Sequence, residues 1–113
     1  MKYRFEIVKK GLRQKFCLVL FEDAKYDLLT DFFGLDARPS LSALKEQFTR
    51  IFKGETQKET FIGDKCILYI FKDKTMVFDK DSKDINSSKV EVDTESLWKI
   101  LQHYESYLRE NRL

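Results

Sequence analysis

The stretch CILYIFKDKTMVF, residues 66–78, decides the fold. Residues 66–71 are all apolar and rich in β-branched and aromatic side chains, which favours a short strand over a turn of helix. An unbroken apolar run is typical of a strand that is covered on both faces. Residues 75–78 run back after the charged three-residue loop 72–74, so the stretch predicts the central hairpin of a sheet. An isolated hairpin is marginal in water, and we therefore expect other strands and helices to cover it.

More strands are expected on both sides of this hairpin. Residues 2–7 alternate between charged and apolar side chains, which predicts a half-exposed strand. The apolar run 16–21 predicts an inner strand antiparallel to the first, after a basic turn at 9–15. Residues 60–62 lead into the central hairpin, and the alternating residues 89–92 predict an edge strand.

Three helices are expected. Asp23 and Gly34 suit the two ends of a helix over 24–33, and residues 35–39 then form a connector. Ser40 caps a second helix that extends to residue 53, and Asp93 caps a third. The apolar positions of the third helix form one stripe that faces the sheet, with Trp98 and Tyr107 at its border; they are Leu97, Leu101, Tyr104 and Leu108.

This order, ββαα-βββ(β)-α, predicts a single α+β domain over residues 1–113, with three helices and an antiparallel sheet of five to six strands. The formal net charge of +2 argues against a dedicated nucleic-acid binder. No apolar run approaches the roughly 18 residues of a membrane-spanning helix, and the N-terminus lacks the apolar core of a signal peptide. We therefore expect a cytoplasmic protein without membrane contact. Cys17 and Cys66 lie in apolar runs and are expected to be buried reduced thiols.

Motifs for chemistry are weak. The single histidine, His103, has no second positioned group for acid–base catalysis, and with two separated cysteines it forms no zinc ligand set. The acidic stretch 79–86 invites comparison with a calcium loop. An EF-hand needs an oxygen ligand, a glycine and a glutamate at its fifth, sixth and twelfth positions, where this chain has Lys83, Asp84 and Val90. The sequence therefore predicts a protein that is not an enzyme and uses no metal or cofactor.

Three surface features are candidate contacts for a partner. An acidic patch surrounds the first predicted helix, and such a patch suits a basic protein surface. The exposed polar loop 79–88 adds more carboxylates, and Tyr or Trp side chains are typical binding anchors. The predicted partner-binding residues are Glu22, Asp23, Tyr26, Asp27, Asp31, Asp79, Asp81, Asp84 and Trp98. The basic turn 9–15 suits phosphate but lacks interleaved aromatics for base stacking. Each feature is also compatible with an ordinary solvated surface.

The layout resembles two groups of small bacterial proteins. The segments that carry the resemblance are Leu44-Lys45-Glu46, Phe52-Lys53-Gly54-Glu55, Gly63-Asp64-Lys65, the apolar hairpin and a closing helix with Tyr104-Glu105-Ser106-Tyr107. Preceded by two strands and two helices, they resemble the YacL family. The same layout resembles immunity proteins of contact-dependent growth inhibition (CdiI-like). Those proteins bind the C-terminal toxin domain of a large exported protein, often a nuclease, and block it. Inhibitors of basic nucleases are often clearly acidic, whereas this chain is slightly basic.

The resemblance implies an immunity protein that binds a cognate toxin C-terminal domain and neutralises it by steric occlusion, without chemistry of its own. A nuclease is the expected toxin if the acidic patch is the docking surface. The alternative is a small nucleic-acid-associated housekeeping protein that uses the basic turn 9–15, and it predicts binding that weakens as the salt concentration rises. An enzyme would need an active site built from scattered carboxylates and His103.

Overall fold

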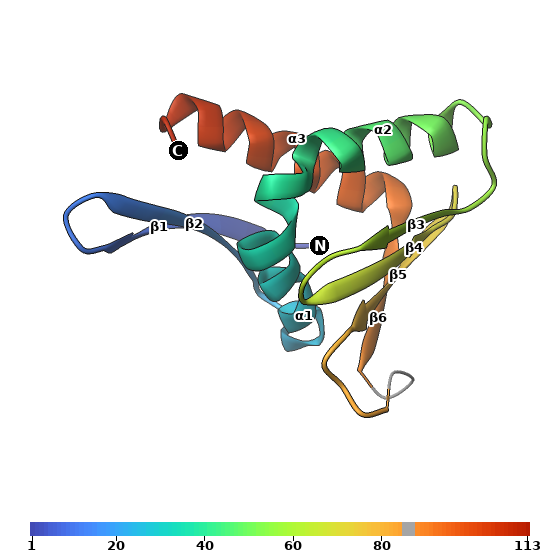
Figure 1. Ribbon diagram of the computed structural model, residues 1–113, viewed down its shortest axis with the longest axis horizontal. Coiled ribbons are helices and arrows are strands. Elements are labelled where there is room, and N and C mark those ends of the chain that lie inside the picture. The colour runs from blue at the N-terminus through green and yellow to red at the C-terminus, as the bar shows by residue number, and fades with distance from the viewer. Residues whose placement is uncertain (85–87) are drawn as a thin grey trace.

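The structure is a computed structural model that describes residues 1–84 and 88–113. Its elements are β1 (Tyr3–Lys10), β2 (Gln14–Phe21), α1 (Asp27–Asp31), α2 (Leu41–Phe52), β3 (Glu59–Ile62), β4 (Cys66–Ile70), β5 (Lys74–Asp79), β6 (Lys89–Asp93) and α3 (Thr94–Glu110). The fold is α+β, as predicted, and contains a two-stranded and a four-stranded antiparallel sheet. In Figure 1, α2 and α3 lie over the four-stranded sheet, the β1–β2 hairpin extends to the other side, and α1 lies between the two sheets.

The N-terminal hairpin does not join the central sheet, so the predicted single sheet of five to six strands is wrong. Among the described residues β1 pairs only with β2, and the other strands follow the order β3-β4-β5-β6. Part of the outer edge of β2 is occupied by a helix, because the Thr30 hydroxyl donates to the Val19 carbonyl at 2.8 Å. The inner face of the hairpin packs on α3, where the rings of Phe5 and Tyr107 are 4.7 Å apart. Helices therefore separate the two sheets.

The chain remains helical from residue 24 to residue 52, so the predicted helix end at Gly34 and the predicted connector 35–39 are wrong. After α1 come a π-helical turn, η2 (Phe32–Ala37), a 3-10 turn, η3 (Arg38–Ser40), and then α2. Figure 1 shows that this segment bends before α2. With α3, residues 1–84 and 88–113 form two helical bodies, where three helices were predicted.

Burial explains why this helical segment continues. Phe33 and Ala37 are completely buried, and a chain that left the helix at Gly34 would remove Ala37 from the core. A glycine ends a helix by adopting a positive φ, as Gly54 does after α2 with φ of +74°, whereas Gly34 has no positive φ. Pro39 lies in the first turn of η3, where its missing N–H costs no helical hydrogen bond.

The central hairpin has a shorter loop than predicted. The Phe71 N–H donates to the Lys74 carbonyl at 3.0 Å, so residues 72 and 73 form the turn and Lys74 begins β5. A three-residue loop would pair Phe71 with Thr75. A slip of one residue turns every side chain of a strand to the opposite face. The observed register instead pairs Leu68 with Val77, and both side chains are completely buried.

Among the residues that the structure describes, helices cover one face of the four-stranded sheet and leave the other uncovered, so the expectation that residues 66–71 are covered on both faces is wrong. Burial alternates along β4 between buried and half-buried residues. On the outer face apolar side chains cover one another. The Tyr69 ring lies 5.2 Å from the Phe78 ring, and the Lys58 ammonium lies 4.1 Å above Tyr69. The unbroken apolar run therefore does not require a second covering layer.

The caps and apolar stripes were predicted more accurately. The Asp93 carboxylate accepts from the Ser96 N–H at 2.9 Å and caps α3, as predicted. Ser40 makes no side-chain cap hydrogen bond, because the chain is already helical before it. The predicted strand 89–92 forms β6, and both cysteines are free and buried, as expected. The predicted stripe of α3 is buried; its residues are Leu97, Leu101, Tyr104 and Leu108.

The outer part of the N-terminal hairpin, residues 8–16, projects from the body of the molecule, and we call it the hairpin arm (Figure 1). Val8 and Phe16 are 38% and 42% exposed, and Leu12 at the turn is fully exposed. The predicted inner strand 16–21 therefore begins on an exposed residue and becomes buried only from Cys17 onward. Within the described parts of the chain, no helix has the length and apolar character needed to cross a membrane.

Candidate protein-binding surface

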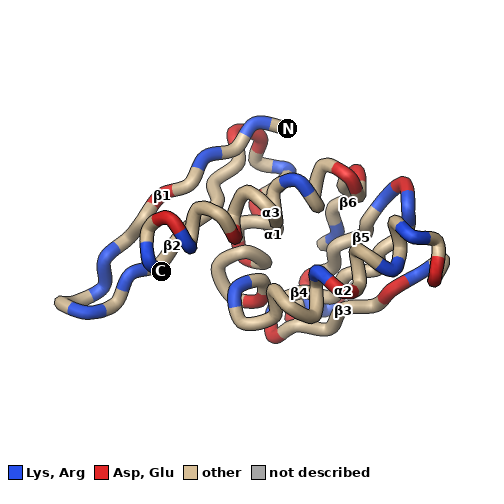
Figure 2. The backbone as a smooth tube through the Cα atoms, turned by 90° about the horizontal axis from the view of Figure 1, so that it is seen from above, with Lys and Arg blue, Asp and Glu red and all other residues tan. Residues whose placement is uncertain are grey.

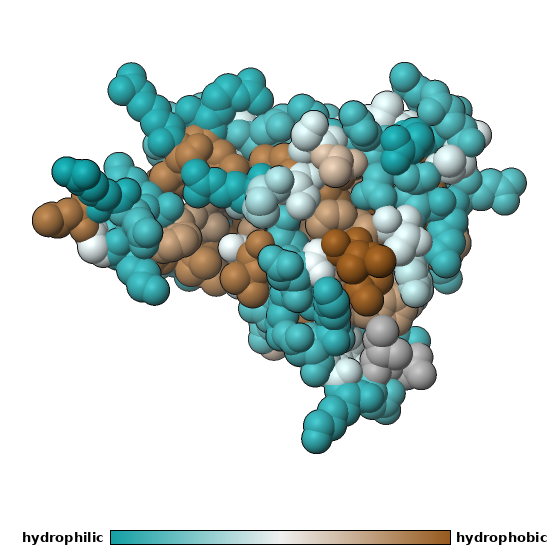
Figure 3. Space-filling model, in the orientation of Figure 1, coloured by the Kyte–Doolittle hydropathy of each residue, from teal (hydrophilic) through white to brown (hydrophobic). Residues whose placement is uncertain are grey.

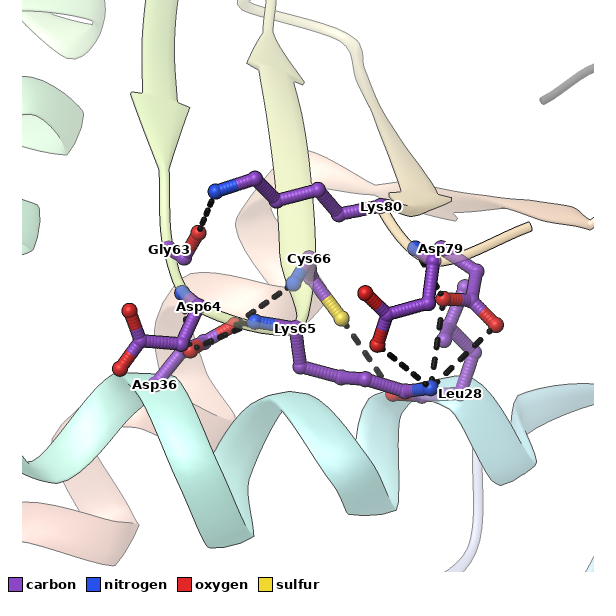
Figure 4. Close-up of polar contacts among 9 residues, drawn as sticks. Leu28, Asp36, Gly63, Asp64, Lys65, Cys66, Asp79 and Lys80 are labelled. Atoms are coloured by element: carbon purple, nitrogen blue, oxygen red, sulfur yellow. Dashed lines mark hydrogen bonds and ion pairs between the residues drawn. The ribbon is translucent and has the colours of Figure 1, made fainter. Parts of the chain in front are cut away.

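A buried aspartate fastens the helical segment to the central sheet and thereby positions the candidate site (Figure 4). The Asp36 carboxylate is 2% exposed and accepts hydrogen bonds from the backbone N–H groups of residues 64–66 at 2.8–3.2 Å. Gly63 leaves room for it, because a Cβ atom there would lie within 3.0 Å of the carboxyl atoms. The Cys66 thiol contacts the Leu28 carbonyl at 3.9 Å. The loop between β3 and β4 is therefore fixed against the helical segment.

This attachment holds the end of β5 beside α1. The Lys65 ammonium forms ion pairs with Asp79 at 3.3 Å and with Asp81 at 3.5 Å. The hydrogen bond to Asp79 raises the pKa of Lys65 above its ordinary value, so its positive charge is retained. The Asp79 carboxylate also accepts from the Asp81 N–H at 3.0 Å. Figure 4 shows the Lys65 side chain extended along the helix toward Asp79.

Asp27 and Asp31 of α1 line one groove with Asp79 of β5, and we call it the acidic groove. The two aspartates of α1 are four residues apart and therefore lie on one face of the helix. The groove has a volume of about 290 Å³. Its lining residues are Lys25, Asp27, Leu28, Asp31, Asp79, Ser88, Lys89 and Val90. The fold thus brings together acidic residues from two stretches that are far apart in the sequence.

Two carboxylates of the acidic groove are uncompensated. Asp27 and Asp31 are exposed, and no lysine or arginine of the described residues lies within ion-pair distance of either. The Lys25 ammonium is 3.8 Å from Asp23 and 5.0 Å above the Tyr26 ring. A basic side chain that enters the groove can therefore pair with Asp27 or Asp31 without displacing an ion pair, although Lys25 and Lys89 also line the groove.

The rest of the predicted acidic patch lies next to this groove. Glu22 and Asp23 are exposed directly after β2, and the half-buried Tyr26 packs its ring 5.9 Å from that of Phe21. All three predicted residues line an open depression of about 650 Å³. Lys25 lines both the depression and the acidic groove, so the two are neighbours. Six of the nine predicted residues therefore share one region of the surface.

The remaining predicted residues do not line either depression. Asp81 is exposed and forms an ion pair with Lys65. Asp84 is also exposed, and its backbone carbonyl accepts a hydrogen bond from the Ser82 hydroxyl at 3.0 Å. The predicted loop 79–88 includes residues 85–87, which lie outside the described residues. Trp98 is half-buried between α2 and α3, with its ring stacked 5.5 Å from that of Phe48. Trp98 thus belongs to the packing of the two helices.

Two residues that build the site were not singled out from the sequence. A signal existed for Lys65, because the hairpin register pairs Cys66 with Asp79 and so brings Lys65 to the acidic end of β5. No comparable signal existed for Asp36. Its three N–H partners lie 28 to 30 residues later in the chain, and only the tertiary fold brings them to the carboxylate.

Other potentially reactive groups lie apart from the acidic groove. The His103 Nδ1 atom is 2.9 Å from the Tyr3 hydroxyl, and its ring packs 4.6 Å from that of Phe5. His103 therefore contributes to the packing of α3 on β1. In residues 1–84 and 88–113, no group of three or more His, Cys, Asp or Glu side chains is arranged to hold a metal ion.

Comparison with known proteins gives no identification. No protein-family model matches the chain, and neither a curated protein nor a solved structure matches it. The resemblance to the YacL family and to CdiI-like immunity proteins therefore rests on the layout of the sequence. Function has to be inferred from the chemistry of the surface.

Proposed function

We propose that this protein is an immunity protein that binds a cognate bacterial toxin domain, of nuclease type, and neutralises it by steric occlusion. The observation that carries the proposal is the convergence of Asp27, Asp31 and Asp79 on one groove. Nucleases bind a polyanion and need positive charge around their active sites. A protein that covers such a site needs negative charge at its docking surface, and unpaired carboxylates supply it.

The small positive net charge of the chain is compatible with this role. Charges in water are screened over about 8 Å at physiological ionic strength, so the groups near an interface dominate its electrostatics. Asp27 and Asp31 lie at the groove itself, whereas four of the 21 basic residues lie in the hairpin arm. The groove's lining has three carboxylates against two lysines, Lys25 and Lys89, so a docking partner meets a small excess of negative charge there.

A nuclease assay tests the proposal directly. The probe is the C-terminal domain of the large exported protein that the proposal expects to be encoded immediately upstream of this protein. We expect one equivalent of this protein to stop nucleic-acid cleavage and to form a stable complex in size-exclusion chromatography. A toxin domain that remains fully active with the protein in excess contradicts the proposal.

Charge reversal locates the docking surface. The double variant Asp27→Lys/Asp31→Lys places two positive charges in the acidic groove, and we expect the dissociation constant of the toxin complex to rise about 100-fold or more. The matched control is Glu95→Lys/Glu110→Lys on α3, with the same change in net charge at two exposed positions. We expect the control to bind within a factor of about two of the parent protein. Equal losses in both double variants would show that net charge, and not the groove, governs binding.

The hairpin arm favours a second candidate function, that of a small nucleic-acid-associated protein. The arm carries Lys9, Lys10, Arg13 and Lys15 and contains no acidic residue. Figure 2 shows these positive residues near the end of the projecting hairpin. A two-stranded ribbon fits the major groove of DNA, and phosphate contacts by lysine and arginine make binding depend on salt.

Fluorescence anisotropy with a labelled DNA duplex and a labelled single-stranded RNA tests this second function. Binding should weaken steeply between 50 and 200 mM salt, in proportion to the number of phosphate contacts. The variant Lys9→Gln/Lys10→Gln/Arg13→Gln should reduce both the affinity and the salt dependence. Its charge-matched control is the variant Lys53→Gln/Lys72→Gln/Lys83→Gln, at three exposed positions outside the arm. Flat binding curves at low salt reject the nucleic-acid function.

A further inference from the structure

The outer edge of β2 carries unpaired backbone groups. In an antiparallel ladder, alternate residues direct their N–H and C=O groups away from the partner strand. The Val19 carbonyl points outward, because it accepts from the Thr30 hydroxyl, so Cys17 and Lys15 direct their backbone groups to the same edge. Throughout residues 1–84 and 88–113, no group forms a hydrogen bond with the outward N–H or C=O of either residue. This edge is therefore able to accept another strand.

A groove runs along this open edge, between the hairpin arm and η2, and we call it the edge groove. It has a volume of about 370 Å³ and mostly apolar walls, which include Phe16 and Leu18 of β2 and Leu35 of η2. Leu35 is 58% exposed. Gly34, on the η2 side of the groove, has no side chain, and the position that its Cβ atom would occupy has no other atom within 4 Å. The groove is therefore open at this point. Figure 3 shows apolar surface extending from the arm toward the helices.

The charged residues of the edge groove define the kind of ligand. Lys10 and Arg38 line the groove, and neither has an ion-pair partner in the described parts of the chain. Asp31 is the acidic residue among the groove's lining. An occupant that carries carboxylates would pair with the two free cations. A second copy of this chain is a poor occupant, because its hairpin arm would bring more positive charge toward Lys10 and Arg38.

We propose that the edge groove binds an extended, acidic segment of a partner protein, which adds to β2 as a third strand. The outward groups of Lys15 and Cys17 supply main-chain hydrogen bonds, and pockets for alternate side chains supply specificity in this mode of recognition. Apolar side chains of the segment pack on Leu18 and Leu35, and acidic side chains pair with Arg38. The edge groove adjoins the acidic groove and shares Asp31 with it, but its open strand edge, Leu35 and Arg38 do not line the acidic groove, so the inference does not depend on the partner being a toxin.

Selection from random octapeptides displayed on phage tests this inference on the intact protein. The enriched peptides are expected to alternate apolar residues with Asp or Glu. When a synthetic copy of such a peptide is added to isotopically labelled protein, the amide signals of Lys15 and Cys17 should shift in NMR spectra. Methylation of alternate backbone nitrogens in the peptide should abolish binding, because it removes the strand hydrogen bonds.

Three single variants separate this site from ordinary exposed apolar surface. Leu35→Glu and Arg38→Glu change exposed residues of the edge groove and should each weaken peptide binding at least tenfold. Ile62→Glu is the control, because Ile62 is a 66% exposed apolar residue on β3. It should bind the peptide within a factor of two of the parent protein. All three positions are exposed, so thermal unfolding midpoints close to that of the parent protein are expected and are measured alongside.

Several results would overturn the inference. It fails if no peptide is enriched, if the enriched peptides lack acidic residues, or if Leu35→Glu binds them as tightly as the parent protein does. Sedimentation analysis of the protein alone tests whether a second copy of this chain binds in the edge groove. A dimer of the parent protein that Leu35→Glu converts to a monomer would assign the edge groove to a second copy of this chain.

Discussion

Asp36 illustrates how a buried charge is tolerated when every lone pair has a donor. Its carboxylate accepts four hydrogen bonds from three consecutive N–H groups, and hydrogen bonds to a charged group contribute about 1.5–3 kcal/mol each. No lysine or arginine pairs with it among the described residues. The backbone N–H groups of the β3–β4 loop take the place of a counter-ion, and the same hydrogen bonds hold the loop in position.

A substitution at Gly63 measures how rigid this arrangement is. Gly63→Ala places a methyl group against the fixed carboxylate, and overpacking of this kind destabilises a protein by about 1–3 kcal/mol. Urea denaturation of the variant gives the free energy of unfolding. Gly34→Ala is the matched control, because its new methyl group meets open space in a helical segment, where alanine is favoured over glycine by about 0.5–1 kcal/mol. Equal effects of the two substitutions would contradict this account of Asp36.

The two cysteines are expected to be unreactive in the folded protein. Burial raises the pKa of the Cys66 thiol to about 12 and also raises that of Cys17, so neither forms a thiolate near pH 8. A chromogenic disulfide reagent at pH 8 should detect no thiol in the native protein and both thiols in guanidinium chloride. Ser42→Cys adds an exposed thiol and is the positive control. Rapid reaction of a thiol in the native parent protein would contradict the burial of these side chains.

At the scale of elements, α2 is joined to β3 by one well-formed ion pair. The Arg50 guanidinium donates to the Glu59 carboxylate at 2.7 Å. This hydrogen bond is the main reason that the pKa of Glu59 lies below its ordinary value of 4.5. A carboxylate whose pKa is lowered by folding stabilises the protein above its ordinary pKa, and the contribution disappears as the pH falls through the lowered value.

Acid denaturation of variants tests this pair. The free energy of unfolding should fall as the pH decreases below about 4.5, and Glu59→Gln should make that fall shallower because glutamine does not titrate. Arg50→Gln should have a similar effect, since it removes the cause of the lowered pKa. Urea denaturation between pH 3 and pH 7 provides the measurement. An unchanged pH dependence in both variants would show that the pair does not form in solution.

The two halves of the β1–β2 hairpin are expected to differ in local stability. Its inner half packs on α3, whereas residues 8–16 have exposed side chains and an open edge. Stability is not uniform in proteins, and segments with few buried contacts open at low cost. In hydrogen exchange, the amides of the arm should therefore exchange much faster than those of β4 and β5. Strong protection of the arm would mean that another molecule covers it.

On the scale of the whole molecule, periodicity and capping residues predicted most of the elements. The stripe of α3 and its cap at Asp93 follow from local sequence, and so do the hairpins of the central sheet. The separation into two sheets was not predictable, because the helices that lie between the hairpin and the central sheet are held there by tertiary contacts such as that of Thr30 with Val19. The continuation of the helix past Gly34 likewise depends on burial and on the distant partners of Asp36.

The candidate site was predicted in composition but not in arrangement. The acidic residues of α1 and the Asp79 region were identified separately, and no local pattern indicated that they line one groove. Trp98 was chosen by residue type as an anchor for a partner, and the fold leaves it half-buried with its ring stacked on Phe48. The edge groove had no signal in the sequence, since it is formed by the open edge of a strand and a helix that passes beside it.

The contact between Tyr3 and His103 joins residues that are 100 positions apart in the chain. The four strands of the central sheet, by comparison, pair with their sequence neighbours and can form early. Because β1 and β2 lie at the start of the chain and α3 lies near its end, the ribosome makes the first hairpin long before the helix on which it packs. Until that helix has been synthesised, Phe5 and its apolar neighbours on the inner face of the hairpin lack the surface on which they pack.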